Sequence, residues 1–319
     1  MKNNNRFHNT GDKPTRLGFG EGLREAGGLN ESVIALGVDI TGSVNVNLFK
    51  DAYPERFYSL GIAEQNAAGV SAGLALSGLI PVFTTYGVFS AMRTTDQLRI
   101  SICYNNVHAI IGGAHAGISV GPDGATHQAL EDIAVTRALP NMTVFSPCDA
   151  DQTHKAVIAA VTEVNGPVYI RFGREKVPNF TGMDYPFNPD KGQIMKTGND
   201  ITIIASGHMV WHALQAAYQM EEKNINARVI NIHTIKPIDK EIIINAARET
   251  GKIITAEEHQ IYGGLGSAVT EVLSEHHPVP VKIIGMPDRF GESGKPEELM
   301  EKYGLTSQNI INQSLKLLK

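Results

Sequence analysis

Cysteine is scarce in this chain of 319 residues, and long hydrophobic stretches are missing. The two cysteines, Cys103 and Cys148, are too few for a disulfide framework, which is typical of a protein from a reducing compartment. No apolar stretch approaches the roughly 18 residues that a membrane-spanning helix needs. The polar N-terminus, residues 1–13, lacks the apolar core of a signal peptide. We therefore expect a cytoplasmic protein with no membrane partner.

The sequence also has no excess of basic charge. It contains 28 Lys and Arg residues and 33 Asp and Glu residues, so the net charge is −5. Such a chain is not expected to have nucleic acid as its main partner. No set of Cys and His residues completes a metal site, so we predict none in this chain. Hydrophobic residues make up 42% of the sequence, enough for substantial cores, and the length suits two domains.

Apolar stretches alternate with helical patterns along most of the chain. Continuous apolar stretches are typical of strands buried on both faces, and their alternation with helices indicates a parallel sheet. We predict an α/β fold with two domains, each a mostly parallel sheet covered by helices. Proline and glycine break the periodicity between residues 174 and 198. The predicted units are a tail (1–14), a first domain (15–175), a linker (176–198) and a second domain (199–319).

The stretch Ser59–Gly69 passes from the end of a strand to a helix rich in small residues. Glu64 falls in the first turn of this helix, where an acidic side chain can simply complement the helix dipole. Alanine, glycine and serine occupy several faces of the helix, however, which indicates close approach by another backbone, a second chain or a flat ligand. A carboxylate in such a contact is suited to share a proton with a ligand nitrogen.

A Gly-rich loop, residues 112–128, follows a predicted buried strand and has no helical pattern. A loop of this length inside a compact domain is usually functional. His115 and His127 lie in it near Asp123, which suggests a polar site for hydroxyl groups or proton transfer. A metal site is the weaker interpretation, because no further Cys or His completes a ligand set.

Two further patterns allow both a structural and a functional interpretation. Tyr86 and Phe89 lie just past a predicted strand, where aromatic side chains usually belong to the core. Gly263–Gly266 opens a predicted helix and could hold a phosphate, although close packing is the commoner reason for such glycines. We assign the second domain to assembly rather than chemistry.

Residues 60–65, Leu-Gly-Ile-Ala-Glu-Gln, resemble the hallmark motif of the transketolase family of thiamine diphosphate enzymes. In that family the glutamate hydrogen-bonds a nitrogen of the cofactor's aminopyrimidine ring, and the resemblance implies this catalytic role for Glu64. The pattern Thr-aromatic-x-x-aromatic is similar to Thr85–Phe89 and implies that Tyr86 and Phe89 hold the pyrimidine ring. Asp39 matches a family acid near the cofactor.

The Gly-rich loop resembles the transketolase pattern His-x-x-x-x-Val-Gly-x-Asp-Gly-x-Thr-His-Gln. The resemblance implies that His115 and His127 contact the carbonyl or hydroxyl groups of the substrate, and that Asp123 binds a hydroxyl near the reacting carbons. Deoxyxylulose-phosphate synthases usually lack the first histidine, and 2-oxoacid dehydrogenase β subunits lack most of the loop. His115 therefore favours transketolase.

Three other residues match positions that bind the substrate phosphate in this family. They are Arg16, Ser43 and Arg174, and the resemblance implies that the substrates are phosphorylated sugars. Two guanidinium groups and a hydroxyl suit the oxygens of a phosphate. The sequence does not distinguish pentose phosphates from branched-sugar phosphates.

The resemblance covers nearly the whole chain but only the second half of a full-length transketolase. The Gly-Asp-Gly motif, which helps to hold Mg²⁺ and the diphosphate in that family, is missing here. We therefore expect this chain to hold the pyrimidine end of thiamine diphosphate. A separate N-terminal subunit would hold the diphosphate and Mg²⁺ in an α2β2 heterotetramer. Met1 favours a separate gene product over a fragment.

Three alternatives stay open. One is the β subunit of a 2-oxoacid dehydrogenase, and another is an enzyme similar to deoxyxylulose-phosphate synthase. The third is a degenerate regulatory subunit that keeps the fold without activity. Retention of Glu64 together with the complete Gly-rich loop speaks against the third, since a scaffold would not need both.

Overall fold

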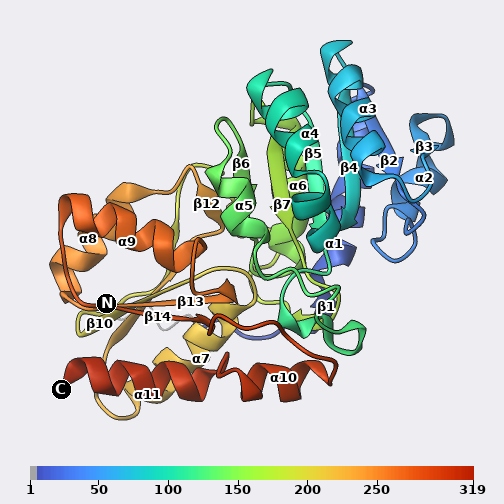
Figure 1. Cartoon of the computed structure of the whole chain (residues 1–319). Coiled ribbons are helices and arrows are strands. Elements are labelled where there is room, and N and C mark those ends of the chain that lie inside the picture. The colour runs from blue at the N-terminus through green and yellow to red at the C-terminus, as the bar shows by residue number, and fades with distance from the viewer. Residues whose placement is uncertain (1–5) are drawn as a thin grey trace.

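The computed structural model describes residues 6–319, in which two sheets are each flanked by helices (Figure 1). Residues 1–5 of the predicted tail lie outside the described residues. The first sheet has the strand order β12-β6-β7-β5-β4-β2-β3, and the second has the order β14-β13-β10-β11-β9. Their strands run parallel except the edge strands β12 and β9, which pair antiparallel. The prediction of two mostly parallel sheets covered by helices is confirmed.

The first sheet buries both of its faces, as its apolar strands predict. Val33 and Ala35 of β2 pack with the helices of one face, and the alternate residues Ile34 and Leu36 pack with those of the other. The first face carries α1 (Thr15–Leu29), α2 (Asn47–Ala52) and α6 (Ala150–Thr162), and the second carries α3 (Glu64–Leu76) and α5 (Asp132–Ala138). The strands are β2 (Val33–Gly37), β3 (Phe57–Ser59), β4 (Ile80–Tyr86), β5 (Ile110–Ala114), β6 (Thr143–Phe145), β7 (Val168–Arg171) and β12 (Thr234–Lys236).

The second sheet is covered in the same way. Helices α7 (Met209–Glu221) and α11 (Ser307–Leu318) pack on one face, and α8 (Lys240–Thr250) and α9 (Leu265–His276) pack on the other. Helix α10 (Pro296–Lys302) follows the sheet and lies beside the Gly-rich loop, where Gly121 approaches Pro296. The strands are β9 (Gln193–Lys196), β10 (Ile201–Ala205), β11 (Ala227–Asn231), β13 (Ile253–Gln260) and β14 (Val281–Met286).

A strand from the second half of the chain joins the first sheet, and the segment between the two halves has strands of its own. The predicted linker contains β8 (Lys176–Pro178), which pairs with β1 (Asp12–Pro14), and also β9 of the second sheet. Strand β12 lies within the second half of the sequence but pairs with β6 at the edge of the first sheet. The predicted division at residues 175–199 therefore falls in a segment with strands of its own, and the two halves are joined by more than a linker.

Residues 89–104 form a helical segment that is not a regular α-helix. It begins as a π-helix at Phe89–Arg93 (η2), passes through α4 (Thr95–Gln97) and ends as a second π-helix at Leu98–Tyr104 (η3). Wide helical turns of this kind are frequent at functional sites. Here the first one carries Phe89, one of the predicted cofactor residues.

The glycines before α9 serve close packing rather than phosphate binding. Both oxygens of the Glu257 carboxylate accept hydrogen bonds at this helix N-terminus, from the backbone N–H of Leu265 at 2.7 Å and of Gly266 at 2.8 Å. A side chain at Gly264 would collide with the same carboxylate. Within residues 6–319, none of the helices combines the length and the hydropathy needed to cross a bilayer.

Candidate active site

A cavity of about 310 Å³ opens where strands β2 and β4 of the first sheet end. Carboxyl ends of parallel strands are where α/β sheets bind ligands. Five residues predicted from the sequence line this cavity together: Asp39, Glu64, Tyr86, Phe89 and His127. The structure thus brings together predicted residues from segments that lie far apart in the sequence.

Glu64 begins helix α3, and only 4% of its surface is exposed. Its Oε1 atom lies 2.9 Å from Nη1 of Arg93, whose guanidinium group in turn lies 4.1 Å from the centre of the Phe89 ring. The charge of this buried carboxylate is therefore balanced within the site. We did not predict Arg93 from the sequence, although its position four residues after Phe89 in a helical segment places both on one face.

Tyr86 is the centre of the site. Its ring stacks on the imidazole of His115 at a centroid distance of 4.3 Å and an interplanar angle of 19°. Its hydroxyl lies 3.2 Å from Oγ of Ser43, and the ring of His127 meets it edge-on at 5.7 Å. His127 also meets Phe89 edge-on, at 5.5 Å. Tyr86 thus links the cavity residues to those predicted to bind substrate.

His115 lies behind Tyr86 with only 1% of its surface exposed. Its Nε2 atom is 3.4 Å from the backbone oxygen of Ser43, and its Nδ1 atom has no hydrogen-bond partner in the described part of the chain. Burial, together with the positive charges of Arg16 and Arg174, lowers the pKa of His115 from 6.5 to about 4. At neutral pH the ring is therefore uncharged, with one nitrogen that donates a hydrogen bond and one that accepts.

Two of the predicted phosphate residues, Arg16 and Ser43, are joined beside His115. Arg16 donates from Nη1 to the backbone oxygen of Ser43 at 2.8 Å, which fixes these two residues side by side. Arg174 donates from Nη1 to the backbone oxygen of Val120 at 3.2 Å and to Oδ1 of Asp123 at 3.3 Å. Arg174 and Asp123 are thus paired with each other at the Gly-rich loop, a contact that the sequence did not reveal.

Asp39 follows β2 closely, is exposed, and adopts a φ of 71°. Aspartate tolerates this left-handed conformation better than most residues do. It lines the cavity together with Glu64, and its role near a cofactor remains a prediction.

Helix α3 presents two different surfaces. Ala67, Ala68 and Ala72 pack inside against the sheet, whereas Gly69 and Gly73 face outward, and a Cβ atom at either glycine would have nothing within 4 Å. Large apolar side chains also lie exposed on this part of the molecule: Tyr58, Ile62, Leu76 and Tyr104. Packing against the sheet explains the inner small residues. The outer glycines and the exposed apolar side chains form an apolar surface beside the cavity.

The depressed pKa of His115 predicts how stability changes in acid. Between pH 6.5 and 4 the unfolded chain binds a proton at this residue that the folded chain does not, so the free energy of unfolding falls as the pH falls through this window. His115→Asn should lose less stability than the wild type between these pH values, because asparagine does not titrate and accepts the positive φ of 51° at this position. Urea unfolding at several pH values measures the slope.

The exposed His8 provides the control for this experiment. His8→Gln should keep the pH slope of the wild type, and an unchanged slope in His115→Asn would contradict the buried, uncharged state of that ring.

Comparisons with known proteins match both halves of the chain. Residues 12–179 match the family "Transketolase, pyrimidine binding domain", and residues 190–310 match "Transketolase, C-terminal domain". The chain is 41% identical to one subunit of the apulose-4-phosphate transketolase of Phocaeicola vulgatus, over 95% of this chain and 97% of that protein. It is 40% identical to a protein of Methanocaldococcus jannaschii named "Putative transketolase C-terminal section", over 96% and 97%.

A solved structure described as "Split gene transketolase, inactive beta4 tetramer" superimposes with a TM-score of 0.88 at 45% identity, and the match covers 97% of this chain and 99% of that one. The fold, both domain matches and these relatives lead to one conclusion: this chain belongs to the transketolase family.

Proposed function

We propose that this chain is the C-terminal subunit of a two-chain, thiamine diphosphate-dependent transketolase. It would transfer a two-carbon ketol unit from a ketose phosphate to an aldose phosphate in the cytoplasm. The observation that carries the proposal is the buried carboxylate of Glu64 in one cavity with the rings of Tyr86 and Phe89. A carboxylate beside aromatic faces fits the aminopyrimidine end of the cofactor, which needs a hydrogen-bond partner and flat walls.

When bound, thiamine diphosphate supplies the nucleophilic carbon on which ketol transfer depends. The chain's own residues would prepare the site for it. Glu64 would hold a proton between its carboxylate and a ring nitrogen, while Tyr86 and Phe89 would orient the ring. His127, which meets both rings edge-on, would contact a substrate oxygen.

Arg16, Ser43 and Arg174 are proposed to bind the phosphate of the sugar. Two of them are fixed beside each other by the hydrogen bond between Arg16 and the Ser43 backbone, and Arg174 lies at the Gly-rich loop. The uncharged imidazole of His115 would offer a hydrogen bond to a hydroxyl or carbonyl of the substrate, and Asp123 would accept one from a hydroxyl. The relative from Phocaeicola vulgatus is also named for a sugar phosphate.

A partner chain is proposed to complete the site. The residues that the structure describes contain no group of three or more His, Cys, Asp or Glu side chains that could hold a metal ion. Mg²⁺ and the diphosphate would be held mainly by an N-terminal subunit. The apolar surface beside the cavity, with Ile62 75% exposed, is suited to such a contact. An α2β2 heterotetramer would cover it, and the similar β4 assembly is described as inactive.

The side-chain packing around His115 favours transketolase over the two other enzyme interpretations. The imidazole is stacked on Tyr86 and lies next to Ser43, so His115 packs against other predicted residues of the site. A screen of the complex for ketol transfer, oxidative decarboxylation and deoxyxylulose-phosphate synthesis separates the three activities.

Glu64→Gln should leave folding intact and reduce turnover about 10²–10⁴-fold, the usual range for the loss of acid–base participation. The amide can still accept a hydrogen bond from Arg93 but cannot share a proton with a ring nitrogen. The measurement is kcat with saturating donor in the presence of the partner subunit and cofactor. Glu31→Gln, at an exposed position, is the control, and near-normal turnover in Glu64→Gln would refute the proposed role.

Arg174→Ala should raise KM for phosphorylated donors, since the loss of a charged hydrogen bond costs about 1.5–3 kcal/mol. A donor without phosphate, such as hydroxypyruvate, should be affected much less. Arg99→Ala, at an exposed position on η3, controls for the loss of a positive charge. An equal loss with both classes of donor would mean that Arg174 only orders the loop through Asp123.

A further inference from the structure

A carboxylate from the second half of the chain lies directly under the Gly-rich loop. Glu258 is part of β13, the strand that pairs with both β10 and β14, and only 5% of its surface is exposed. Beyond Ala256 the pairing of this strand with β14 shifts, and Gln260 donates its backbone N–H to the backbone oxygen of Leu130 at 2.9 Å. The end of β13 thus reaches the first domain, while Gln260 still pairs with Met286 of β14.

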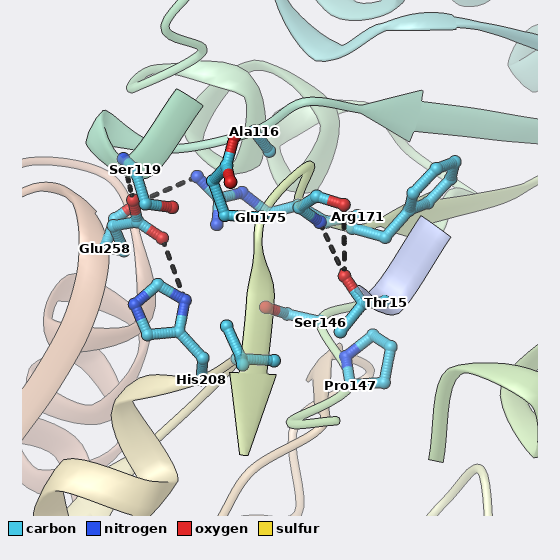
Figure 2. Close-up of a pocket in the computed structure, with 13 residues that line it drawn as sticks. Thr15, Ala116, Ser119, Ser146, Pro147, Arg171, Glu175, His208 and Glu258 are labelled. Carbon is cyan, nitrogen blue, oxygen red and sulfur yellow. Dashed lines mark hydrogen bonds and ion pairs between the residues drawn. The ribbon is translucent and has the colours of Figure 1, made fainter. Parts of the chain in front are cut away.

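Both oxygens of the Glu258 carboxylate are engaged there, as Figure 2 shows. Oε1 accepts a hydrogen bond from the backbone N–H of Ser119 at 2.5 Å, and Oε2 lies 3.1 Å from Nδ1 of His208. The backbone oxygen of Glu258 accepts a hydrogen bond from Nη2 of Arg171 at 2.7 Å. Contacts of the side chain and of the backbone therefore fix this residue against the loop.

The loop is shaped to receive this carboxylate. Gly117 has a φ of +90°, and a Cβ atom at this position would lie 2.2 Å from Cδ of Glu258. The backbone N–H of Gly117 donates to the backbone oxygen of Ala129 at 2.9 Å, which closes the base of the loop. Glycine at 117 thus serves close approach to Glu258, a reason that differs from substrate binding.

We propose that Glu258 is a positioning residue that holds the Gly-rich loop in the geometry that presents His115, Asp123 and His127. This inference rests on the proposed function of the loop, but the contact itself lies entirely within the described chain. The second domain would therefore contribute to substrate binding through a defined hydrogen bond, in addition to its role in assembly.

A second contact strengthens the inference. The side-chain amide of Gln128 donates to the backbone oxygen of Ile118 at 3.2 Å and to that of Glu292 at 2.9 Å. The middle and the end of the loop are thus tied to each other and to a segment just before α10. Glu258, however, is the contact that supplies a charged acceptor to a loop N–H.

The neighbouring residue provides a matched control. Glu257 is also buried, lies on the same strand and accepts hydrogen bonds from backbone N–H groups, but these belong to α9 and not to the Gly-rich loop. Alanine at either position removes a buried carboxylate and leaves N–H groups without their acceptor. Only Glu258→Ala should act on the loop.

The first test is amide hydrogen exchange on the full chain with no cofactor or substrate added. Glu258→Ala should speed exchange at Ser119 and its neighbours in the loop by about 10- to 100-fold, the factor expected for a lost charged hydrogen bond. Glu257→Ala should instead speed exchange at Leu265 and Gly266. Unchanged exchange of the loop in Glu258→Ala would overturn the proposal, whether or not the complex transfers ketol units.

The second test uses the complex with the partner subunit. Glu258→Ala should lower kcat/KM for the donor about 10-fold or more while the affinity for thiamine diphosphate stays at the wild-type value, and Glu257→Ala should not show this split. Glu258→Gln keeps an oxygen that can accept from Ser119, so it should recover part of the loss and serves if the alanine variant does not fold. Equal effects of both alanine variants would show that Glu258 contributes only stability. If the wild-type complex shows no ketol transfer, the proposed function is refuted. The hydrogen-exchange result on the full chain then tests the positioning role of Glu258 by itself.

Discussion

A buried ion pair between Arg171 and Asp132 holds the main parts of this structure together. Nε of Arg171, at the end of β7, lies 2.9 Å from Oδ2 of Asp132 at the start of α5, and Tyr169 donates its hydroxyl to the same oxygen at 2.9 Å. Only 6% of Arg171 and none of Asp132 is exposed. Removing one partner of such a pair typically costs about 3–5 kcal/mol, because the other charge is left buried and uncompensated.

The same guanidinium group connects the two domains. From Nη2, Arg171 donates to the backbone oxygens of Ala129 and Glu258, which belong to the base of the Gly-rich loop and to the end of β13. One side chain therefore fixes the loop, the first sheet and the second sheet relative to one another. The apolar core also joins the two domains, because Ile133 of α5 and Ile243 of α8 belong to one continuous cluster. We infer that site geometry and domain packing are not independent in this chain.

Much of this architecture could be predicted from the sequence, because continuous apolar strands alternate with helices. The cavity residues Glu64, Tyr86 and Phe89 could be found from the transketolase-like motifs, and the structure places them together. What the sequence did not reveal depends on contacts between distant segments. Local patterns say nothing of the return of β12 to the first sheet or of the approach of Glu258 to the loop.

Two features of the site needed the folded environment in addition. The low pKa of His115 arises from burial and from Arg16 and Arg174, neither of which is a sequence neighbour. The pairing of Arg93 with Glu64 joins η2 to the start of α3, two segments that are not neighbours in the sequence. For the glycines before α9, in the second domain, the sequence was sufficient. They were interpreted as packing, and in the structure Glu257 fills that helix N-terminus.

Calorimetric titration with thiamine diphosphate and Mg²⁺, on the chain alone and then with its N-terminal partner, is the most direct test of the split site. It asks whether this chain supplies the pyrimidine half of the cofactor site and needs a second chain for the other half. We expect weak binding and no ketol transfer by the isolated chain, and stoichiometric binding with ketol transfer once the partner is added. Micromolar cofactor binding and full ketol transfer by the isolated chain would contradict this division of the site.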